Sequence, residues 1–296
     1  MVKKILSYSY VYFILILMYL PIFYLIASSF TNTEMVGQWN GFSFNLYYRL
    51  FHNEEVLIAI GNTLILAVIA ASVSTLLGSL GAIGLFYSKK SVRRVFEGIN
   101  QIPVVNAEIV MAISLTVTFV FIGKNIFNGA DLKSFWTLLI GHCLIATPFV
   151  YLNVKPRLIQ MDPAMYEAGL DLGYTPLKAL HRIIYPEILP GIVAGFSLSF
   201  SLSLDDFIIT FFTRGSGLLS GENTIETVST LVEEKIKKGD VPPEMRAYTT
   251  ILFSIAVSVI LIRSIYASVK SRKNIVNNKH SKRREALKRW KENLIQ

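Results

Sequence analysis

The sequence predicts an all-α membrane protein that crosses the bilayer six times. Hydrophobic residues fill 52% of its 296 positions and charged residues only 17%, whereas soluble domains average about 25% charged residues. Six apolar runs reach or approach the roughly twenty residues that a helix needs to cross a bilayer. They lie near Tyr8–Ala27, Ala59–Phe86, Ile99–Ile122, Phe135–Asn153, Ile188–Phe212 and Ala247–Val269.

The predicted domain organisation is a six-span unit over residues 1–269 and a basic tail over 270–296. The first run follows Lys3 and Lys4, as the apolar region of a signal peptide would, but it has no clean cleavage site of small residues. We therefore interpret it as an uncleaved first span. The single cysteine, Cys143, excludes an intramolecular disulfide.

The net charge of +9 reflects membrane topology rather than binding to nucleic acid. Basic residues concentrate in alternate loops, most clearly in the short loop that holds Lys89, Lys90, Arg93 and Arg94. Loops with an excess of Lys and Arg stay on the cytoplasmic side. Both termini are therefore predicted to be cytoplasmic. The basic tail fits either a solvated segment or one that binds anionic lipid headgroups.

The second span carries small residues, including Gly78, Gly81 and Gly84. Such residues let helix backbones approach closely in lipid, so we expect them to pack against a neighbouring span. The loop after the fifth span contains apolar residues at helical spacing between Thr224 and Lys238. That spacing predicts an outer helix that packs on its own bundle or forms part of a docking surface.

Three carboxylates fall inside predicted spans: Glu108, Asp205 and Asp206. A carboxylate at the bilayer centre costs about 2.5–3.5 kcal/mol, so it normally faces a cavity or a partner. Steps of four, three and four residues place Ser199, Ser203, Asp206 and Thr210 on one face of a continuous helix. This face fits a water-filled path that attracts cations, or acids that cap a broken helix or pair with a basic neighbour. His142 is interpreted as a hydrogen-bonded packing residue.

The segment between the fourth and fifth spans, about residues 154–187, predicts two short helices around a turn. Asp162 and Pro163 favour the start of the first helix, and Gly173 suits its left-handed end. The second helix is expected from Thr175-Pro176 to Tyr185, where Pro186 would break it before the fifth span. Leu170, Leu172 and Leu177 would be exposed apolar residues, which fits either a plug for a groove or two interfacial helices without a partner.

The sequence shows no catalytic constellation. It contains no Walker A sequence, and its four histidines have no metal-ligand spacing. We therefore expect neither ATP hydrolysis by this chain nor another enzymatic activity.

The central loop resembles a known motif. Glu167-Ala168-Gly169, Gly173, Ile183 and Pro186 resemble the EAA loop of ABC importer permeases, with Gly169 and Tyr185 in place of the usual Ala and Leu. The resemblance implies a type I ABC importer permease fold. It also implies that this loop is the coupling helix for a cytoplasmic ATPase. The residues carried over to that role are Glu167, Ala168, Gly169, Leu172, Gly173 and Pro186.

The similarity extends over about residues 10–270. PVVNAEIVMAISL at 103–115, AGFSLSFSLSLDDFIITFF at 194–212 and PEMRAYTTIL at 243–252 are similar to permeases of spermidine/putrescine importers. This similarity implies a polyamine as substrate, a polycation that the carboxylates would suit. Asp206, Asp205, Glu108 and Ser203 would then line its pathway.

The resemblance also implies the partners. These are a second permease, two cytoplasmic ATPase subunits that hold ATP and Mg, an external polyamine-binding protein and the lipid bilayer of a bacterial inner membrane. No cofactor is expected in this chain. Two alternatives stay open: a permease for another small cation or metal, and a secondary transporter that needs no ATPase.

Overall fold

The computed structural model describes residues 2–33, 37–128, 131–162, 164–215, 225–239, 242–255 and 257–258. They divide into two compact units, Met1–His52 with Pro242–Gln296, and Asn53–Val241. Five helices in the described ranges are long and apolar enough to cross a membrane. Much of the predicted sixth span, Ala247–Val269, and all of the basic tail lie outside the described residues.

The first unit holds α1 (Val2–Ser29), α2 (Asn45–His52) and a helical stretch over 245–255 and 257–258. The described apolar side chains of α1 are nearly all exposed, as expected for a helix that faces lipid. An aromatic cluster of Phe30, Phe42, Phe44 and Tyr47 orders the loop between α1 and α2. The guanidinium of Arg246 donates hydrogen bonds to the carbonyls of Ser28 and Thr33.

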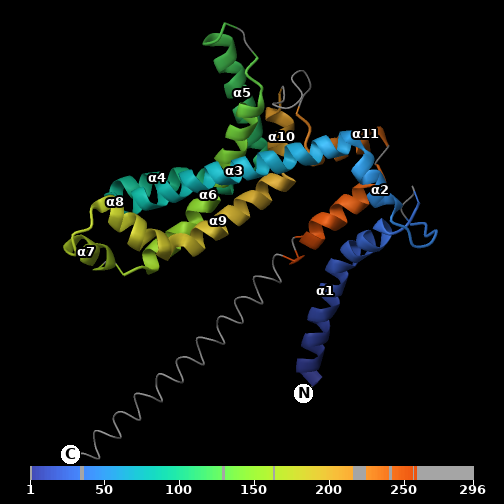
Figure 1. Cartoon of the computed structure of the whole chain (residues 1–296), viewed down its shortest axis with the longest axis horizontal. Helices are drawn as coiled ribbons and strands as arrows, with labels where there is room; N and C mark the ends of the chain where they lie inside the picture. Colours follow the sequence, from blue (N-terminus) through green and yellow to red (C-terminus); the bar gives the residue numbers. More distant parts are fainter. Residues whose placement is uncertain are drawn as a thin grey trace, which may run out of the picture. The chain divides into compact units, whose positions relative to one another are not determined.

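The second unit is built around three long helices that pack along their lengths: α3 (Glu54–Phe86), α6 (Phe135–Gln160) and α9 (Tyr185–Asp205) (Figure 1). Small residues allow the close approach. A Cβ on Gly78 of α3 would lie 2.7 Å from Val150 Cβ of α6, and one on Gly195 of α9 would lie 3.1 Å from Val150 Cα. The expected packing role is therefore confirmed for Gly78, whereas Gly81 and Gly84 face open space.

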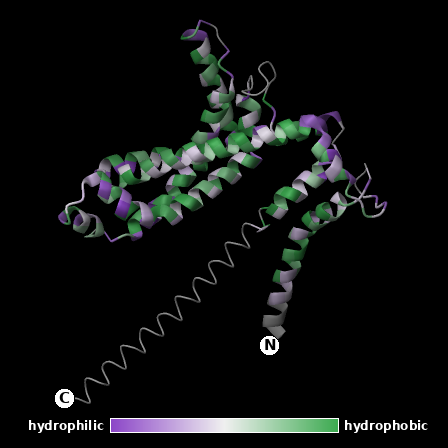
Figure 2. Cartoon of the chain, viewed as in Figure 1, coloured by the Kyte–Doolittle hydropathy of each residue, from purple (hydrophilic) through white to green (hydrophobic). Residues whose placement is uncertain are grey.

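Hydropathy varies from place to place within this second unit. Figure 2 shows apolar residues along α3, α6 and α9, with more hydrophilic residues near α7 and along α11. α11 (Val228–Lys238) packs on α3, and its Val228 and Leu231 are buried. The outer helix expected between Thr224 and Lys238 is therefore present and packs on its own bundle.

The predicted third span, Ile99–Ile122, is wrong as a single helix. The structure has α4 (Lys90–Val105) and α5 (Glu108–Asn125), separated by extended backbone at Asn106 and Ala107. Glu108 occupies the first turn of α5, where a negative charge complements the helix dipole. It is therefore the first residue of the third candidate span and does not lie in the middle of it.

The predicted fifth span, Ile188–Phe212, is also interrupted. α9 ends at Asp205, Asp206 adopts an extended conformation, and α10 (Ile208–Thr213) follows. The expectation that Ser199, Ser203, Asp206 and Thr210 lie on one continuous helix is therefore wrong. Side chains of Asp206 and its neighbours replace the missing backbone hydrogen bonds, as described below.

The loop between α6 and α9 contains α7 (Ala164–Asp171), α8 (Pro176–Ala179) and the π turn η1 (Leu180–Ile184). The first short helix is confirmed as α7, whereas the second predicted helix is the start of a longer one. The predicted break at Pro186 is wrong, because a continuous helix runs from Pro176 to Asp205. Figure 1 shows α7 and α8 at one end of the α3–α6–α9 bundle, with α10 at the other end.

Candidate functional site

The turn between α7 and α8 is fixed by local backbone geometry. The carboxylate of Asp162 accepts a hydrogen bond of 3.0 Å from the backbone N–H of Ala164 at the start of α7. At its other end Gly173 has φ of +83°, and the N–H of Tyr174 donates to the carbonyl of Gly169 at 3.1 Å. A left-handed glycine that ends a helix in this way reverses the chain sharply. The left-handed helix end predicted at Gly173 is therefore confirmed.

The tip of this loop is apolar and exposed. The exposed fractions of Leu172 and Leu177 are 80% and 79%. Glu167 and Ala168 are exposed on α7, whereas Gly169 is buried. The loop therefore presents two leucines and a carboxylate outwards, and attaches to its own bundle through the opposite side of α7.

The π turn η1 explains why Pro186 does not break the helix. The N–H of Tyr185 donates to the carbonyl of Leu180, five residues earlier. Proline lacks an N–H and its ring crowds the carbonyl four residues before it. A wider π turn just before Pro186 relieves that crowding, and α9 continues.

At the far end of α9, three polar side chains meet around His142 of α6. His142 is 4% exposed; its Nδ1 hydrogen-bonds with Ser203 Oγ at 2.8 Å and its Nε2 with Thr210 Oγ1 at 3.0 Å. The hydroxyl of Thr210 donates to Asp206 Oδ2 at 2.9 Å. Because that hydroxyl already donates, the Nε2 of His142 carries the proton toward Thr210, and Nδ1 accepts from Ser203.

Asp206 holds the start of α10. Its Oδ2 accepts from the backbone N–H of Thr210 at 2.8 Å, and its Oδ1 accepts from that of Ile209 at 3.3 Å. The backbone carbonyl of Asp206 accepts from Ser229 Oγ at 2.7 Å. The side chain is only 10% exposed and lies 3.5 Å from His142 Nε2. Asp206 thus acts as the cap of a broken helix, one of the two readings that the sequence left open.

The other predicted pathway residues lie in different settings. Asp205 is exposed at the last residue of α9, and Glu108 is exposed in the first turn of α5. Ser203 is buried against His142. Ser199 is fully buried, and its hydroxyl has no hydrogen-bond partner among the residues that the structure describes. The structure therefore brings Ser203, Asp206 and Thr210 together and leaves Asp205 as the accessible acid of the pair.

The interpretation of His142 as a hydrogen-bonded packing residue is confirmed, and it is the centre of the polar cluster. Reasoning from the sequence missed a second cluster, around Glu97. Glu97 of α4 accepts hydrogen bonds from Arg93 at 2.9 Å and from the Tyr151 hydroxyl of α6 at 3.0 Å. Lys155 of α6 forms an ion pair with the same oxygen at 2.7 Å.

The Glu97 cluster joins α4 to the half of α6 that holds Tyr151 and Lys155. The hydrogen bond from Lys155, followed by that from Arg93, lowers the pKa of Glu97 to about 2. Glu97 is therefore ionised throughout the physiological pH range. A carboxylate with three donors fixes the position of α4 on α6.

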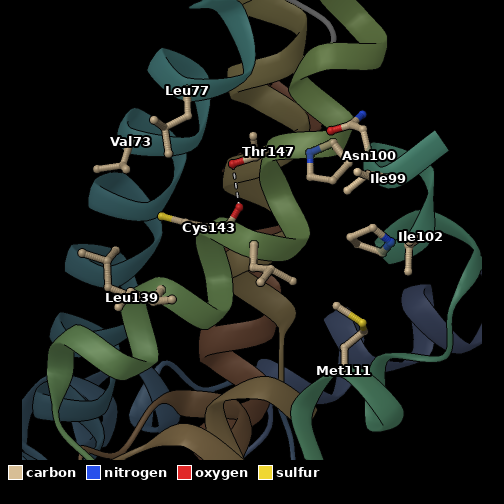
Figure 3. Close-up of a pocket in the computed structure, with 13 residues that line it drawn as sticks. Val73, Leu77, Ile99, Asn100, Ile102, Met111, Leu139, Cys143 and Thr147 are labelled. Atoms are coloured by element: carbon tan, nitrogen blue, oxygen red, sulfur yellow. Dashed lines mark hydrogen bonds between the residues drawn. The ribbon is translucent and has the colours of Figure 1, made fainter. Parts of the chain in front are cut away.

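An apolar groove lies between α3, α4, α5 and α6, with a volume of about 620 Å³. Figure 3 shows Val73 and Leu77 of α3 facing Ile99, Asn100 and Ile102 of α4, with Cys143 and Thr147 of α6 between them. The residues that line it include no carboxylate. Its chemistry suits hydrocarbon and not a polycation, so it is not a candidate substrate site.

Comparison with known proteins identifies a family and several relatives of this chain. Residues 74–274 match the family described as "Binding-protein-dependent transport system inner membrane component". The spermidine/putrescine transport system permease protein PotC of Escherichia coli (strain K12) is 32% identical over 257 residues, 87% of this chain and 92% of that protein. The putrescine transport system permease protein PotI of the same strain is 30% identical over 268 residues, 90% and 92%.

The fold is also that of a solved transporter subunit. A chain of a bacterial ABC transporter that imports the acidic polysaccharide alginate superposes with a TM-score of 0.67. It is 19% identical, and the match covers 92% of this chain and 95% of that one. At this identity the match supports a common fold.

Proposed function

We propose that this chain, which belongs to the family of binding-protein-dependent transport system inner membrane components, is a permease subunit of an ATP-driven importer for polyamines. It is a multi-pass membrane protein and a transport subunit, and not the ATPase of its system. PotC and PotI, which the chain resembles over most of its length, are named as permeases for spermidine and putrescine.

The coupling role rests on one observation, the two-helix loop at the end of the bundle. Leu172 and Leu177 are almost fully exposed on either side of the left-handed turn at Gly173. Exposed leucines that project from a tight turn suit an apolar cleft of another protein. We assign Glu167, Ala168, Leu172 and Gly173 to the contact with a cytoplasmic ATPase, and Gly169 and Pro186 to the attachment of the loop to α9.

The substrate pathway is proposed at the break between α9 and α10. Asp205 supplies an accessible carboxylate there, and Asp206 with Ser203 shapes the break through His142. Glu108, exposed at the start of α5, supplies a second charge. Carboxylates along a path raise the local concentration of a polycation such as spermidine.

The proposed assembly contains a second permease, two ATPase subunits that bind ATP and Mg, and an extracytoplasmic polyamine-binding protein. Both termini would lie in the cytoplasm of a bacterial cell, on the side of the basic loop that holds Lys89, Lys90, Arg93 and Arg94. Another small cation is the alternative substrate, since the carboxylates alone select charge and not chain length.

The coupling role is tested by replacing both tip leucines with aspartate. Leu172→Asp with Leu177→Asp should abolish recovery of the ATPase with the tagged chain and reduce putrescine uptake by proteoliposomes at least about tenfold, because two desolvated contacts are lost. Ile236→Asp is the matched control, since Ile236 is 58% exposed on α11 and outside the loop. Unchanged ATPase recovery in the double variant would refute the coupling assignment, and uptake by the purified chain alone would favour a secondary transporter.

A further inference from the structure

One buried residue of α7 lies at its contact with the segment that leads into α9. Of the eight residues of α7, Gly169 is the one that is buried. It faces the π turn η1, where the terminal methyl of Ile183 occupies the space that a Cβ on Gly169 would take. Ala179 of α8 forms the next wall, 3.7 Å from that Cβ position. We call this contact the Gly169–Ile183 seat.

The π turn determines which way Ile183 points. A π turn holds one more residue than the same turn of α-helix, so it rotates the preceding side chains by about 100° relative to the following ones. Ile184 and Ile188 are fully buried in the core with Val150 and Val154 of α6. Ile183, half-buried, points instead to α7. Neighbouring residues of one short segment thus contact different parts of the protein: Ile183 contacts α7, and Ile184 and Ile188 pack in the core of the bundle.

The helix that carries Ile183 reaches the polar break without interruption. From η1 the chain continues through the 21 residues of α9, a length of about 31 Å at 1.5 Å per residue. It ends at Asp205, beside the cluster of His142, Ser203 and Asp206. One continuous helix therefore connects the Gly169–Ile183 seat to the proposed substrate pathway.

A second contact links α7 to a different helix. The ring of Tyr166 lies 5.4 Å from that of Tyr87, which caps α3. This pair is more exposed, since Tyr87 is 49% exposed. It restrains α7 against α3, while the seat restrains α7 against α9.

We infer that the Gly169–Ile183 seat makes α7, η1 and α9 move as one body, and that Ile183 is the positioning residue that carries movement of the coupling loop to the Asp205–Asp206 break. The inference rests on the proposed function, because it gives the coupling loop its mechanical connection. It adds a residue, Ile183, whose side chain contacts neither the substrate pathway nor the exposed tip.

The test exchanges the two halves of the seat. Gly169→Leu fills the space that the Ile183 side chain occupies, and Ile183→Ala leaves that space empty. In the double variant, the leucine at position 169 fills the space that the shortened side chain at position 183 leaves. Gly169→Ala should be mild, because the overlapping atom is a terminal methyl that can rotate. Gly81→Leu is the control, since a Cβ there meets nothing within 4 Å. Copurification of the partner subunits verifies assembly of each variant.

Two readouts are measured on the complete importer in proteoliposomes. In each single variant the putrescine imported per ATP hydrolysed should fall about tenfold, within the usual range for coupling between sites. In the double variant it should recover to within about threefold of the parent, because contacting residues are not additive. A double variant no better than the worse single variant, or single variants with parental coupling, would overturn the inference.

The second readout does not depend on the substrate. Spin labels at Asp171 in α7 and Leu198 in α9, on a chain with Cys143→Ser, report the distance between the loop and the span. The distance should stay constant on addition of ATP in the parent and should shift or broaden in either single variant. A shift in the parent itself would refute the one-body movement. A parent that keeps this distance and hydrolyses ATP but imports no putrescine or spermidine would instead refute the proposed substrate.

Discussion

The two ends of α9 are both irregular, but in opposite ways. At the start, the π turn at Leu180–Ile184 keeps the helix continuous past Pro186. At the end, the backbone leaves the helix at Asp206, and α10 begins as a separate six-residue helix. The first end is packed by apolar side chains such as Ile184 and Ile188, whereas the second is held by hydrogen bonds around His142.

The difference indicates what each end can do. A helix that widens but does not break still transmits a push along its axis, since its backbone hydrogen bonds continue. A helix that breaks can pivot, provided that side chains supply the lost hydrogen bonds. We therefore expect force to enter α9 at the π turn and change of shape to occur at Asp206.

The largest expected effect is at the broken end. Asp206→Ala removes the acceptor for two backbone N–H groups and for the Thr210 hydroxyl. It should lower the free energy of unfolding by about 2–4 kcal/mol, the sum of a lost cap and of buried donors left unpaired. The measurement is the thermal unfolding of the purified chain in detergent.

Asp205→Ala is the matched control, because Asp205 is the exposed neighbour. It should leave the unfolding temperature unchanged and reduce putrescine uptake about tenfold, through loss of a charge that concentrates the cation. Equal destabilisation by the two substitutions would contradict the division between a capping acid and an accessible acid.

An intermediate effect is expected at Gly173, in the turn that precedes the π turn and α9. Gly173 has φ of +83°, a conformation that costs an L-residue roughly 1–2 kcal/mol. Gly173→Ala should therefore weaken binding of the ATPase about tenfold, measured by titration of the ATPase into the reconstituted permeases. Gly98→Ala in α4, where a Cβ meets nothing within 4 Å, should bind normally. Unchanged affinity for Gly173→Ala would show that the turn is not part of the docking geometry.

The smallest effect on stability is expected at the π turn itself. Pro186→Ala restores an N–H and allows η1 to tighten toward an α-helix, so the free energy of unfolding should change by less than about 1 kcal/mol. Ile183 would then rotate away from Gly169, and the putrescine imported per ATP should fall. Pro190→Ala, one turn further along α9, should not lower this ratio. A loss of stability with normal coupling in Pro186→Ala would contradict the role assigned to the π turn.

The sequence by itself determined the helical membrane class, the first, second and fourth spans, and the short helix α7 with its turn at Gly173. These follow from local physics: an apolar run long enough for the bilayer, a proline and an aspartate at a helix start, and a glycine where φ is positive. The role of Gly78 could also be predicted, since a small residue in lipid favours close packing.

Only the tertiary structure decided where long helices break or widen. Asn106, Asp206 and Pro186 all weaken a helix locally, yet the chain is interrupted at the first two and continuous at the third. The outcome depends on whether neighbours satisfy the freed backbone groups. Asp206 has His142, Thr210 and Ser229 around it, and Pro186 has a π turn whose Ile183 packs on Gly169. Those partners lie far apart in the sequence or depend on helix register, so no local pattern predicts them.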